Sequence, residues 1–412
     1  MPGPAGFHAL CSRDVVLSSA ENFVLYLLLE ATPQGAGGVR LPLNLGIVLD
    51  RSGSMYDEKR LDSVSEAVKY LVDQLGPEDR AAVVAFADKA AVVATPEQLQ
   101  SDKARVKRAI DDIDLLEIGG GTQMALGMEA ALAEVEKNYS ANRLNRLLLL
   151  TDGQTYEERK CLDLARQQRE RISCSTLGVG IEFNEKLLME IAEASGANYH
   201  FISDAATIPD IFSRELQGLR NVALTNARLE TRLSAGIQVR EVFRASPQIY
   251  ALKDVTPDAE RALTIPLGDL EVGVPNSALL VLVLPPRKPG RVRLAQAQLS
   301  YDTPTARDQG ESVEVVVNYT LDRASAGKPN GYVMNLVDQV SIAKLQSQAE
   351  AAIATGNIDK ATRLLGNAIA GTQRLGNTKA TQVLVALQNE VKKTQSLASR
   401  AAKTQLLTAQ AT

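Results

Sequence analysis

The sequence has few of the residues that build nucleophilic, zinc or disulfide chemistry. Among its 412 residues are two histidines, His8 and His200, and three cysteines, at positions 11, 161 and 174. The cysteines are odd in number and lack metal-ligand spacing, which favours reduced thiols in a cytosolic protein over a disulfide framework. His200 falls in a segment typical of a packed strand, and His8 lies far from it in the chain, so a His-based catalytic dyad is not indicated.

Segments for export or membrane insertion are also lacking. The first residues contain no basic stretch followed by an apolar one, which predicts no secretory signal. The longest apolar runs, 23–29 and 278–284, cover seven residues each, about a third of the ~20 residues that a membrane helix needs. The net charge of −4 does not favour nucleic acid or a membrane as a partner. We therefore expect a soluble, cytoplasmic protein.

From residue 41 to 220, short apolar strands alternate with amphipathic helices. This alternation predicts parallel β-α-β units and a doubly wound, mostly parallel α/β sheet. The expected strands are 43–49, 81–86, 147–150, 175–179 and 198–202, with a short antiparallel strand at 90–94. The expected helices are 61–75, 104–113, 124–135, 157–169, 185–193 and 206–219.

After residue 221 the pattern changes to strands separated by glycine and proline clusters, which predicts an antiparallel β-sandwich over 221–330. Residues 1–40 hold two more strands, 14–17 and 23–31, and two strands are not stable alone in water. We therefore expect them to complete the sandwich, so that the α/β domain is inserted into a β domain.

The helical C-terminal region, 331–412, contains neither proline nor aromatic residues from residue 335 onward. Glycine–asparagine pairs at 356–357 and 376–377 divide it into three helices. Residues 335–412 carry a charge of +5 and the remaining chain −9. The region is expected to dock on its own chain, although an acidic surface on another protein is an alternative.

Oxygen-bearing side chains gather at the expected strand ends of the α/β domain. Asp50, Ser52 and Ser54 follow the first strand at alternate positions, Thr122 follows three glycines, and Asp152 ends the apolar strand 147–150. In a doubly wound sheet, ligands bind beyond the carboxyl ends of the strands. Carboxylate and hydroxyl oxygens are the donors that Mg²⁺ or Mn²⁺ prefers.

These three loops resemble the metal-ion-dependent adhesion site of von Willebrand factor type A domains, with every signature position filled. The resemblance implies that Ser52 and Ser54 ligate the metal directly, that Asp50 and Asp152 hold it largely through water, and that Thr122 binds directly or through water. It also implies a vacant position that accepts an Asp or Glu carboxylate of a partner protein, often within a multiprotein assembly. The resulting expectation is a divalent-metal-dependent protein–protein interaction module and not an enzyme.

Several alternatives remain open at this stage. One is a metal-assisted phosphatase or hydrolase, although Ser52 stands where such an enzyme would want a second carboxylate and no phosphate-binding P-loop is present. A second is a scaffold whose helical region is the main binding surface, and a third is a type A fold that has lost its metal. Arg51 either adds positive charge at the rim of the site or is a solvated loop residue paired with Asp57 or Glu58.

Overall fold

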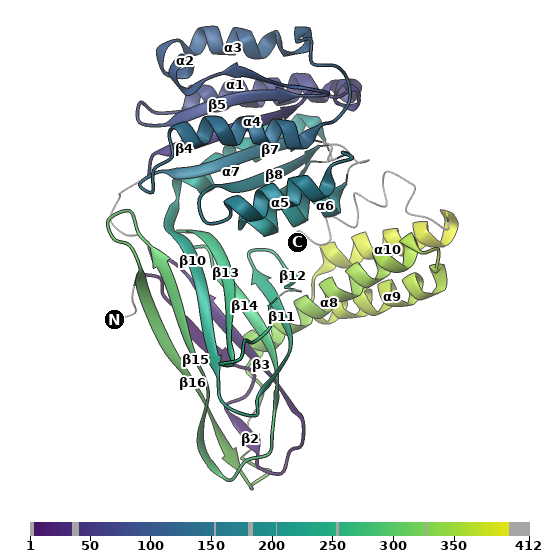
Figure 1. Ribbon diagram of the computed structural model, residues 1–412. Coiled ribbons are helices and arrows are strands. Elements are labelled where there is room, and N and C mark those ends of the chain that lie inside the picture. The colour runs from purple at the N-terminus through teal and green to yellow at the C-terminus, as the bar shows by residue number, and fades with distance from the viewer. Residues whose placement is uncertain are drawn as a thin grey trace. The chain divides into compact units, whose positions relative to one another are not determined.

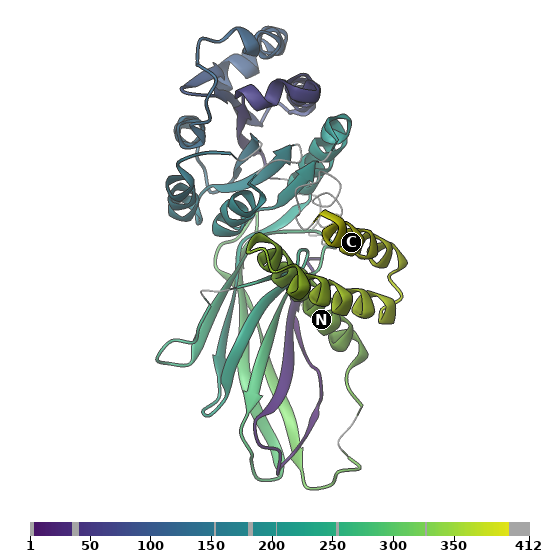
Figure 2. The same ribbon diagram turned by 90° about the vertical axis from the view of Figure 1, so that its right-hand side faces the viewer.

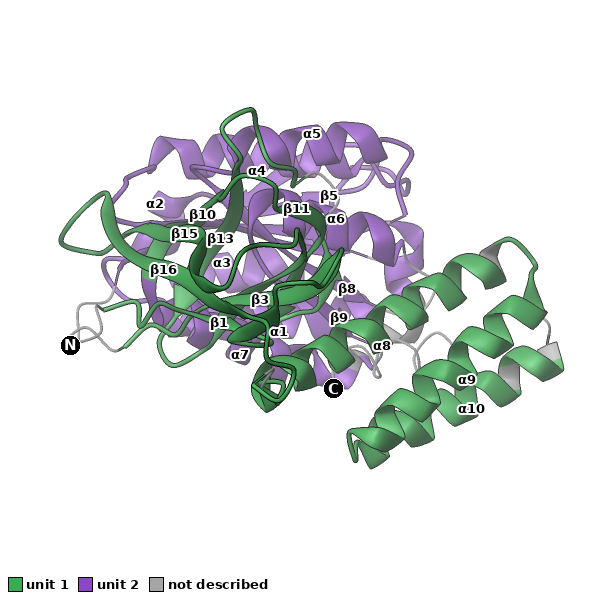
Figure 3. Cartoon of the chain, turned by 90° about the horizontal axis from the view of Figure 1, so that it is seen from below, with its two compact units in different colours: residues 1–36, 224–412 green, residues 37–223 purple. Residues whose placement is uncertain are grey.

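The computed structural model describes residues 4–34, 41–151, 154–179, 184–202, 204–252, 255–325 and 328–394. The chain forms two compact units, one of residues 1–36 and 224–412 and the other of residues 37–223 (Figure 3). Within the described ranges, no helix is long and apolar enough to cross a membrane.

The second unit is built on a six-stranded sheet with the order β6-β5-β4-β7-β8-β9 (Figure 1). Every residue of the central strand β4 is buried, which explains its nearly continuous apolar sequence. All neighbouring strands run parallel except β5 and β6, whose antiparallel pairing agrees with the sequence prediction. The strands are β4 (Leu43–Asp50), β5 (Arg80–Phe86), β6 (Ala90–Ala94), β7 (Leu144–Thr151), β8 (Ser173–Val179) and β9 (Tyr199–Ile202).

Helices cover both faces of this sheet, as expected for a doubly wound fold (Figure 1). One face packs against α1 (Arg60–Gln74), α3 (Lys103–Asp111) and α7 (Ile208–Arg220). The other packs against α4 (Met124–Lys137), α5 (Glu158–Gln168) and α6 (Glu185–Ser195). The sequence analysis missed α2 (Pro96–Ser101), because six residues held by a Thr95 capping box are too short to show helical periodicity.

The strand order reverses beside β4. The chain leaves β4 for β5 and β6 on one side and then crosses over to β7 on the other side. The carboxyl ends of β4 and β7 therefore lie next to each other at the point where ligands bind in such sheets.

The first unit contains a sandwich of two five-stranded sheets. One sheet has the order β1 (His8–Cys11), β3 (Phe23–Ala31), β14 (Asn276–Leu284), β11 (Gln238–Ser246) and β12 (Tyr250–Ala251). The other has the order β13 (Ala262–Glu271), β10 (Val222–Leu233), β15 (Gly290–Asp302), β16 (Gln309–Thr320) and β2 (Val15–Leu17).

The N-terminal strands complete the sandwich, as the sequence predicts, because β3 pairs with β14 and β2 pairs with β16. The expectation of a purely antiparallel sandwich is wrong at one edge, where β2 and β16 run parallel. Strands β1, β11 and β12 were not predicted; charged residues interrupt the apolar pattern of β11.

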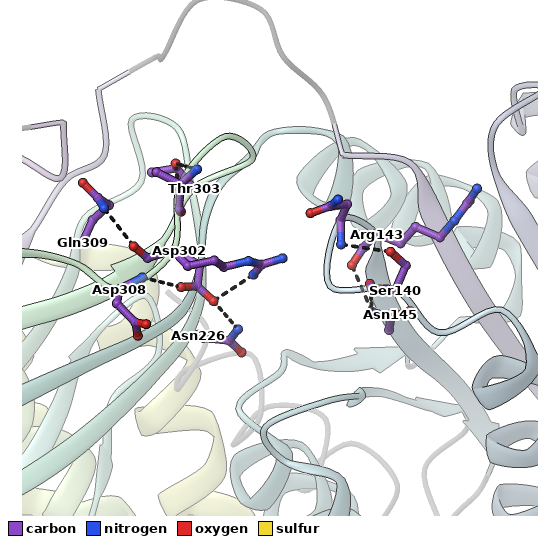
Figure 4. Close-up of polar contacts among 11 residues, drawn as sticks. Ser140, Arg143, Asn145, Asn226, Asp302, Thr303, Asp308 and Gln309 are labelled. Carbon is purple, nitrogen blue, oxygen red and sulfur yellow. Dashed lines mark hydrogen bonds and ion pairs between the residues drawn. The ribbon is translucent and has the colours of Figure 1, made fainter.

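The β15–β16 turn is closed by the carboxylate of Asp302 (Figure 4). It accepts hydrogen bonds from Asn226 Nδ2 at 2.8 Å, Arg307 Nη1 at 2.8 Å and the Asp308 backbone N–H at 3.0 Å. Burial alone would raise the pKa of Asp302, but these three donors outweigh it and lower the pKa. The carboxylate therefore stays ionised and fixes the turn.

The helical region consists of α8 (Gly331–Ala354), α9 (Ile358–Arg374) and α10 (Thr378–Thr394), the yellow-green helices of Figure 2. Gly356 and Gly376 end α8 and α9 with left-handed φ angles of 72° and 71°, at the predicted breaks. The first half of α8 packs Val333 and Val337 onto the β3–β14–β11 sheet. The helix therefore docks on its own chain, mainly through apolar contacts and not through the charge difference noted in the sequence.

Candidate metal centre

Asp50 lies at the carboxyl end of β4 and is fully buried. Its Oδ1 accepts a hydrogen bond from the Ser52 backbone N–H at 2.8 Å, and its Oδ2 accepts one from Thr151 Oγ1 at 2.6 Å. Thr151 is the last residue of β7, so the bond joins the two strands that flank the reversal in strand order. These donors stabilise an ionised carboxylate and fix its orientation.

The two serine hydroxyls of the loop that follows Asp50 lie next to each other. Ser52 Oγ and Ser54 Oγ lie 3.2 Å apart. Adjacent ligands on a magnesium octahedron with metal–oxygen distances of about 2.1 Å would lie about 3.0 Å apart. The hydroxyl pair and the carboxylate therefore suit a small, hard divalent cation. Within the described residues, no three His, Cys, Asp or Glu side chains gather into an alternative metal cluster.

The glycine loop before α4, which carries Thr122, contacts the serine loop. The Gly53 N–H donates to Gly120 O at 3.1 Å, which joins the serine loop to the glycine loop, and Thr122 is half-buried two residues later. The Asp88 carboxylate accepts the Gly120 N–H at 3.0 Å. A Cβ on either neighbouring glycine, Gly119 or Gly121, would approach an Asp88 oxygen to 2.1 Å. The glycines are therefore needed for this close approach of Asp88.

The fifth predicted ligand, Asp152, lies outside the described residues. Thr151 before it and Thr155 after it form hydrogen bonds to residues of the candidate site. Thr151 Oγ1 donates to Asp50, and Thr155 Oγ1 donates to the Thr122 backbone carbonyl at 2.9 Å. All three predicted loops thus contact one another through their described residues.

Arg51 has a role that neither sequence interpretation gave it. Both interpretations placed its side chain at the surface, but the residue is only 9% exposed. Its guanidinium donates to the backbone carbonyls of Gly119 at 2.5 Å, Asp114 at 3.3 Å and Ile113 at 3.4 Å, and also to that of Leu116. The planar guanidinium, with its five donors, suits such a contact. Arg51 therefore fastens the segment before the glycine loop to the serine loop.

Replacing Arg51 with glutamine is expected to lower the free energy of unfolding by about 2 kcal/mol, since hydrogen bonds from a charged donor to buried carbonyls are lost. Mg²⁺ affinity should fall roughly tenfold, because two ligand-bearing loops lose their tether. Urea denaturation and isothermal titration measure the two effects. Arg80→Gln is the matched control, because Arg80 also donates to backbone carbonyls, those of Pro77 and Asp79. Equal Mg²⁺ affinities in the two variants would contradict the role of Arg51.

Thr151 and Asp88 were not predicted to contribute side-chain contacts to the site. Thr151 could have been found, because it ends the same strand that precedes Asp152. The contact of Asp88 with the glycine loop spans 32 residues and depends on the β5–β6 turn, so no local pattern indicates it.

Comparison with known proteins agrees with this fold. Residues 44–214 match the family model of the von Willebrand factor type A domain. These residues form an α/β domain like that of von Willebrand factor type A. Residues 331–410 match a second model, the Sll0103-like C-terminal alpha-helical domain.

Two bacterial relatives of the chain, both described as uncharacterized proteins, match much of it. The protein sll0103 of Synechocystis sp. is 32% identical over 274 residues, which are 65% of this chain and 63% of that protein. YfbK of Escherichia coli is 31% identical over 180 residues, which are 42% of this chain and 31% of that protein. The chain therefore spans less than two thirds of the length of either relative.

Solved structures extend the likeness to nearly the whole chain. A von Willebrand factor type A protein from Catenulispora acidiphila has a TM-score of 0.76 at 22% identity and covers 92% of this chain and 89% of its own. The ArnB paralog VWA2 from Sulfolobus acidocaldarius has a TM-score of 0.63 at 14% identity and covers 98% of this chain and 97% of its own. At these identities the likeness concerns the fold.

A second polar cluster in the type A domain is built on Glu215 of α7. The carboxylate is buried and accepts hydrogen bonds from Ser175 Oγ at 2.6 Å and His200 Nε2 at 2.7 Å, and Arg146 Nη1 lies 3.6 Å away. Burial would raise the pKa of Glu215, but His200, Arg146 and Ser175 outweigh it and hold the pKa at about 2. The cluster attaches α7 to three strands of the sheet.

The three cysteines are free and buried. Burial raises the pKa of each thiol to about 12. Because the thiolate is the reactive form, these side chains are poor nucleophiles at neutral pH.

Proposed function

We propose that the type A domain is a divalent-metal-dependent protein-binding module. Asp50, Ser52, Ser54, Thr122 and Asp152 would hold Mg²⁺ or Mn²⁺, and the bound cation would accept an Asp or Glu carboxylate of a partner protein. The observation that carries this proposal is the pair of serine hydroxyls, 3.2 Å apart, beside a buried carboxylate at the reversal in strand order.

The donor set supports binding of an acidic partner. Neutral hydroxyls close to the cation leave most of its double charge uncompensated, so a further carboxylate is attracted. Type A domains generally mediate protein–protein interactions, and many bind a divalent metal through this motif. The cysteines are buried and unreactive, and the Nε2 of the partly exposed His200 is held by the buried Glu215 carboxylate at 2.7 Å, so neither group favours hydrolysis.

We also propose the division of the chain that the sequence predicts. The type A domain would occupy 41–220, between sandwich segments 1–40 and 221–330, with the helical region at 331–412. The two compact units and the pairing of β3 with β14 support these boundaries.

Acetate tests the proposed function in its simplest form, because it carries only the carboxylate. Calorimetric titration of the full-length protein should show binding of Mg²⁺, followed by binding of acetate to the Mg²⁺-loaded protein. EDTA should abolish acetate binding. Acetamide, which has the same shape without the charge, should not bind. Absence of Mg²⁺ binding, or acetate binding that EDTA does not change, would refute the proposal.

A further inference from the structure

Three large apolar or aromatic side chains are exposed on the loops of the candidate metal centre. Tyr56 is 50% exposed, Leu115 is 72% exposed and Tyr156 is fully exposed. Tyr56 lies on the serine loop, Leu115 on the segment that leads into the glycine loop, and Tyr156 on the loop that follows β7. Met55, next to Tyr56, is fully buried in the core, so Tyr56 is the residue of this pair that remains available to a partner.

Leu115 is held beside the serine loop by Arg51. The carbonyls of both its neighbours, Asp114 and Leu116, accept hydrogen bonds from the Arg51 guanidinium. Arg51 stands between Asp50 and Ser52, so these bonds fix the short helix η2 (Ile113–Leu115) next to the candidate ligands. The backbone of Leu115 is thus anchored while its side chain stays in solvent.

The two tyrosines are close in sequence to residues of the site. Tyr156 follows Thr155, whose hydroxyl donates to the backbone carbonyl of Thr122 at 2.9 Å. Tyr56 lies two residues after Ser54, within the 3-10 helix η1 (Gly53–Lys59). We call Tyr56, Leu115 and Tyr156 the apolar rim.

Single exposed apolar side chains are common on protein surfaces, but three on loops that contact one another at a candidate site favour a surface that a partner covers. Tyrosine is enriched among the residues that dominate binding energy at interfaces, because it buries a large area at a small entropic cost. A partner segment whose carboxylate reached the cation would lie over these loops, which hydrogen-bond to one another. The residues next to that carboxylate in the partner would then contact the apolar rim.

We propose that the site recognises an Asp or Glu flanked by large apolar residues in a segment of a partner protein. This inference rests on the proposed function and specifies the partner's chemistry. The cation attracts the carboxylate of the partner's Asp or Glu. The apolar rim favours partner segments in which the residues next to that Asp or Glu are large and apolar. Burial of one leucine side chain against the rim corresponds to roughly tenfold in affinity.

Synthetic peptides test this selection on the full-length protein with Mg²⁺. A blocked pentapeptide with a central glutamate flanked by leucines should bind about tenfold more tightly than the same peptide flanked by serines. Leu115→Ser and Tyr156→Ser should each reduce this preference at least about threefold and leave Mg²⁺ affinity unchanged. Leu321→Ser is the matched control, because Leu321 is 74% exposed but lies on the sandwich unit; it should change neither quantity.

The possible outcomes separate the two proposals. Equal affinity for the leucine-flanked and serine-flanked glutamate peptides, both sensitive to EDTA, would refute the apolar rim and leave the proposed function standing. A glutamine-centred peptide that bound as well as the glutamate peptide, or a failure of every peptide to bind the Mg²⁺-loaded protein, would refute both. Mg²⁺-dependent self-association that Leu115→Ser abolished would identify a second copy of the chain as the occupant and overturn the assignment to a partner protein.

Discussion

Replacing Asp50 with asparagine is expected to weaken Mg²⁺ binding at least about 100-fold. A unit charge about 4 Å from a divalent cation contributes roughly 8 kcal/mol at an effective dielectric constant of about 20. Loss of only a third of this energy would raise the dissociation constant for Mg²⁺ about 100-fold. Asparagine has nearly the same shape as aspartate and keeps an oxygen that can accept the Thr151 hydroxyl. The variant therefore isolates the loss of charge from a change in packing.

Isothermal titration with Mg²⁺ and Mn²⁺ measures this effect, and urea denaturation in EDTA shows whether the fold is kept. Stability without metal should change little, because removal of a buried charge offsets loss of the hydrogen bond from the Ser52 N–H. Asp73→Asn is the control, because Asp73 forms a surface ion pair with Lys107 in the same domain. Undiminished metal binding by Asp50→Asn would remove Asp50 from the candidate site.

Replacing Glu215 with alanine is expected to destabilise the type A domain by about 3–5 kcal/mol, since a buried carboxylate that contacts Arg146, Ser175 and His200 is removed. Arg146, only 3% exposed, would be left without this carboxylate. The exposed pair of Glu136 with Arg171 provides the control. Glu136→Ala should cost less than about 1 kcal/mol. Hydrogen exchange of β8 amides measures both changes within the domain, and similar losses in the two variants would argue against a special role for Glu215.

The same carboxylate gives a pH dependence with a definite sign. The folded pKa of Glu215, about 2, lies below its ordinary value of 4.5. Its contribution to stability is therefore complete above pH 4.5 and is lost as the pH falls towards 2. Glu215→Gln should flatten the stability profile of the domain between pH 5 and pH 2.5 relative to the unmodified protein. Parallel profiles would show that the carboxylate does not contribute in this way.

The sequence determined those features that depend on neighbouring residues. The apolar run of β4 and the Asp-x-Ser-x-Ser sequence that begins at its last residue predict three oxygen donors at a strand end. The glycine–asparagine breaks fixed the three C-terminal helices, because a left-handed glycine ends a helix wherever it packs. The insertion of the type A domain into the sandwich was also predictable, since two isolated N-terminal strands need partners.

Only the tertiary structure showed which side chains meet across long distances in the chain. Arg51 looked like a solvated loop residue because its neighbours in sequence are polar, yet its guanidinium contacts carbonyls more than 60 residues away. The contact of Glu215 with Ser175, the parallel pairing of β2 with β16 and the approach of Asp88 to the glycine loop likewise depend on strand order. Periodicity and turn signals act over a few residues, whereas these contacts form only after the sheets have assembled.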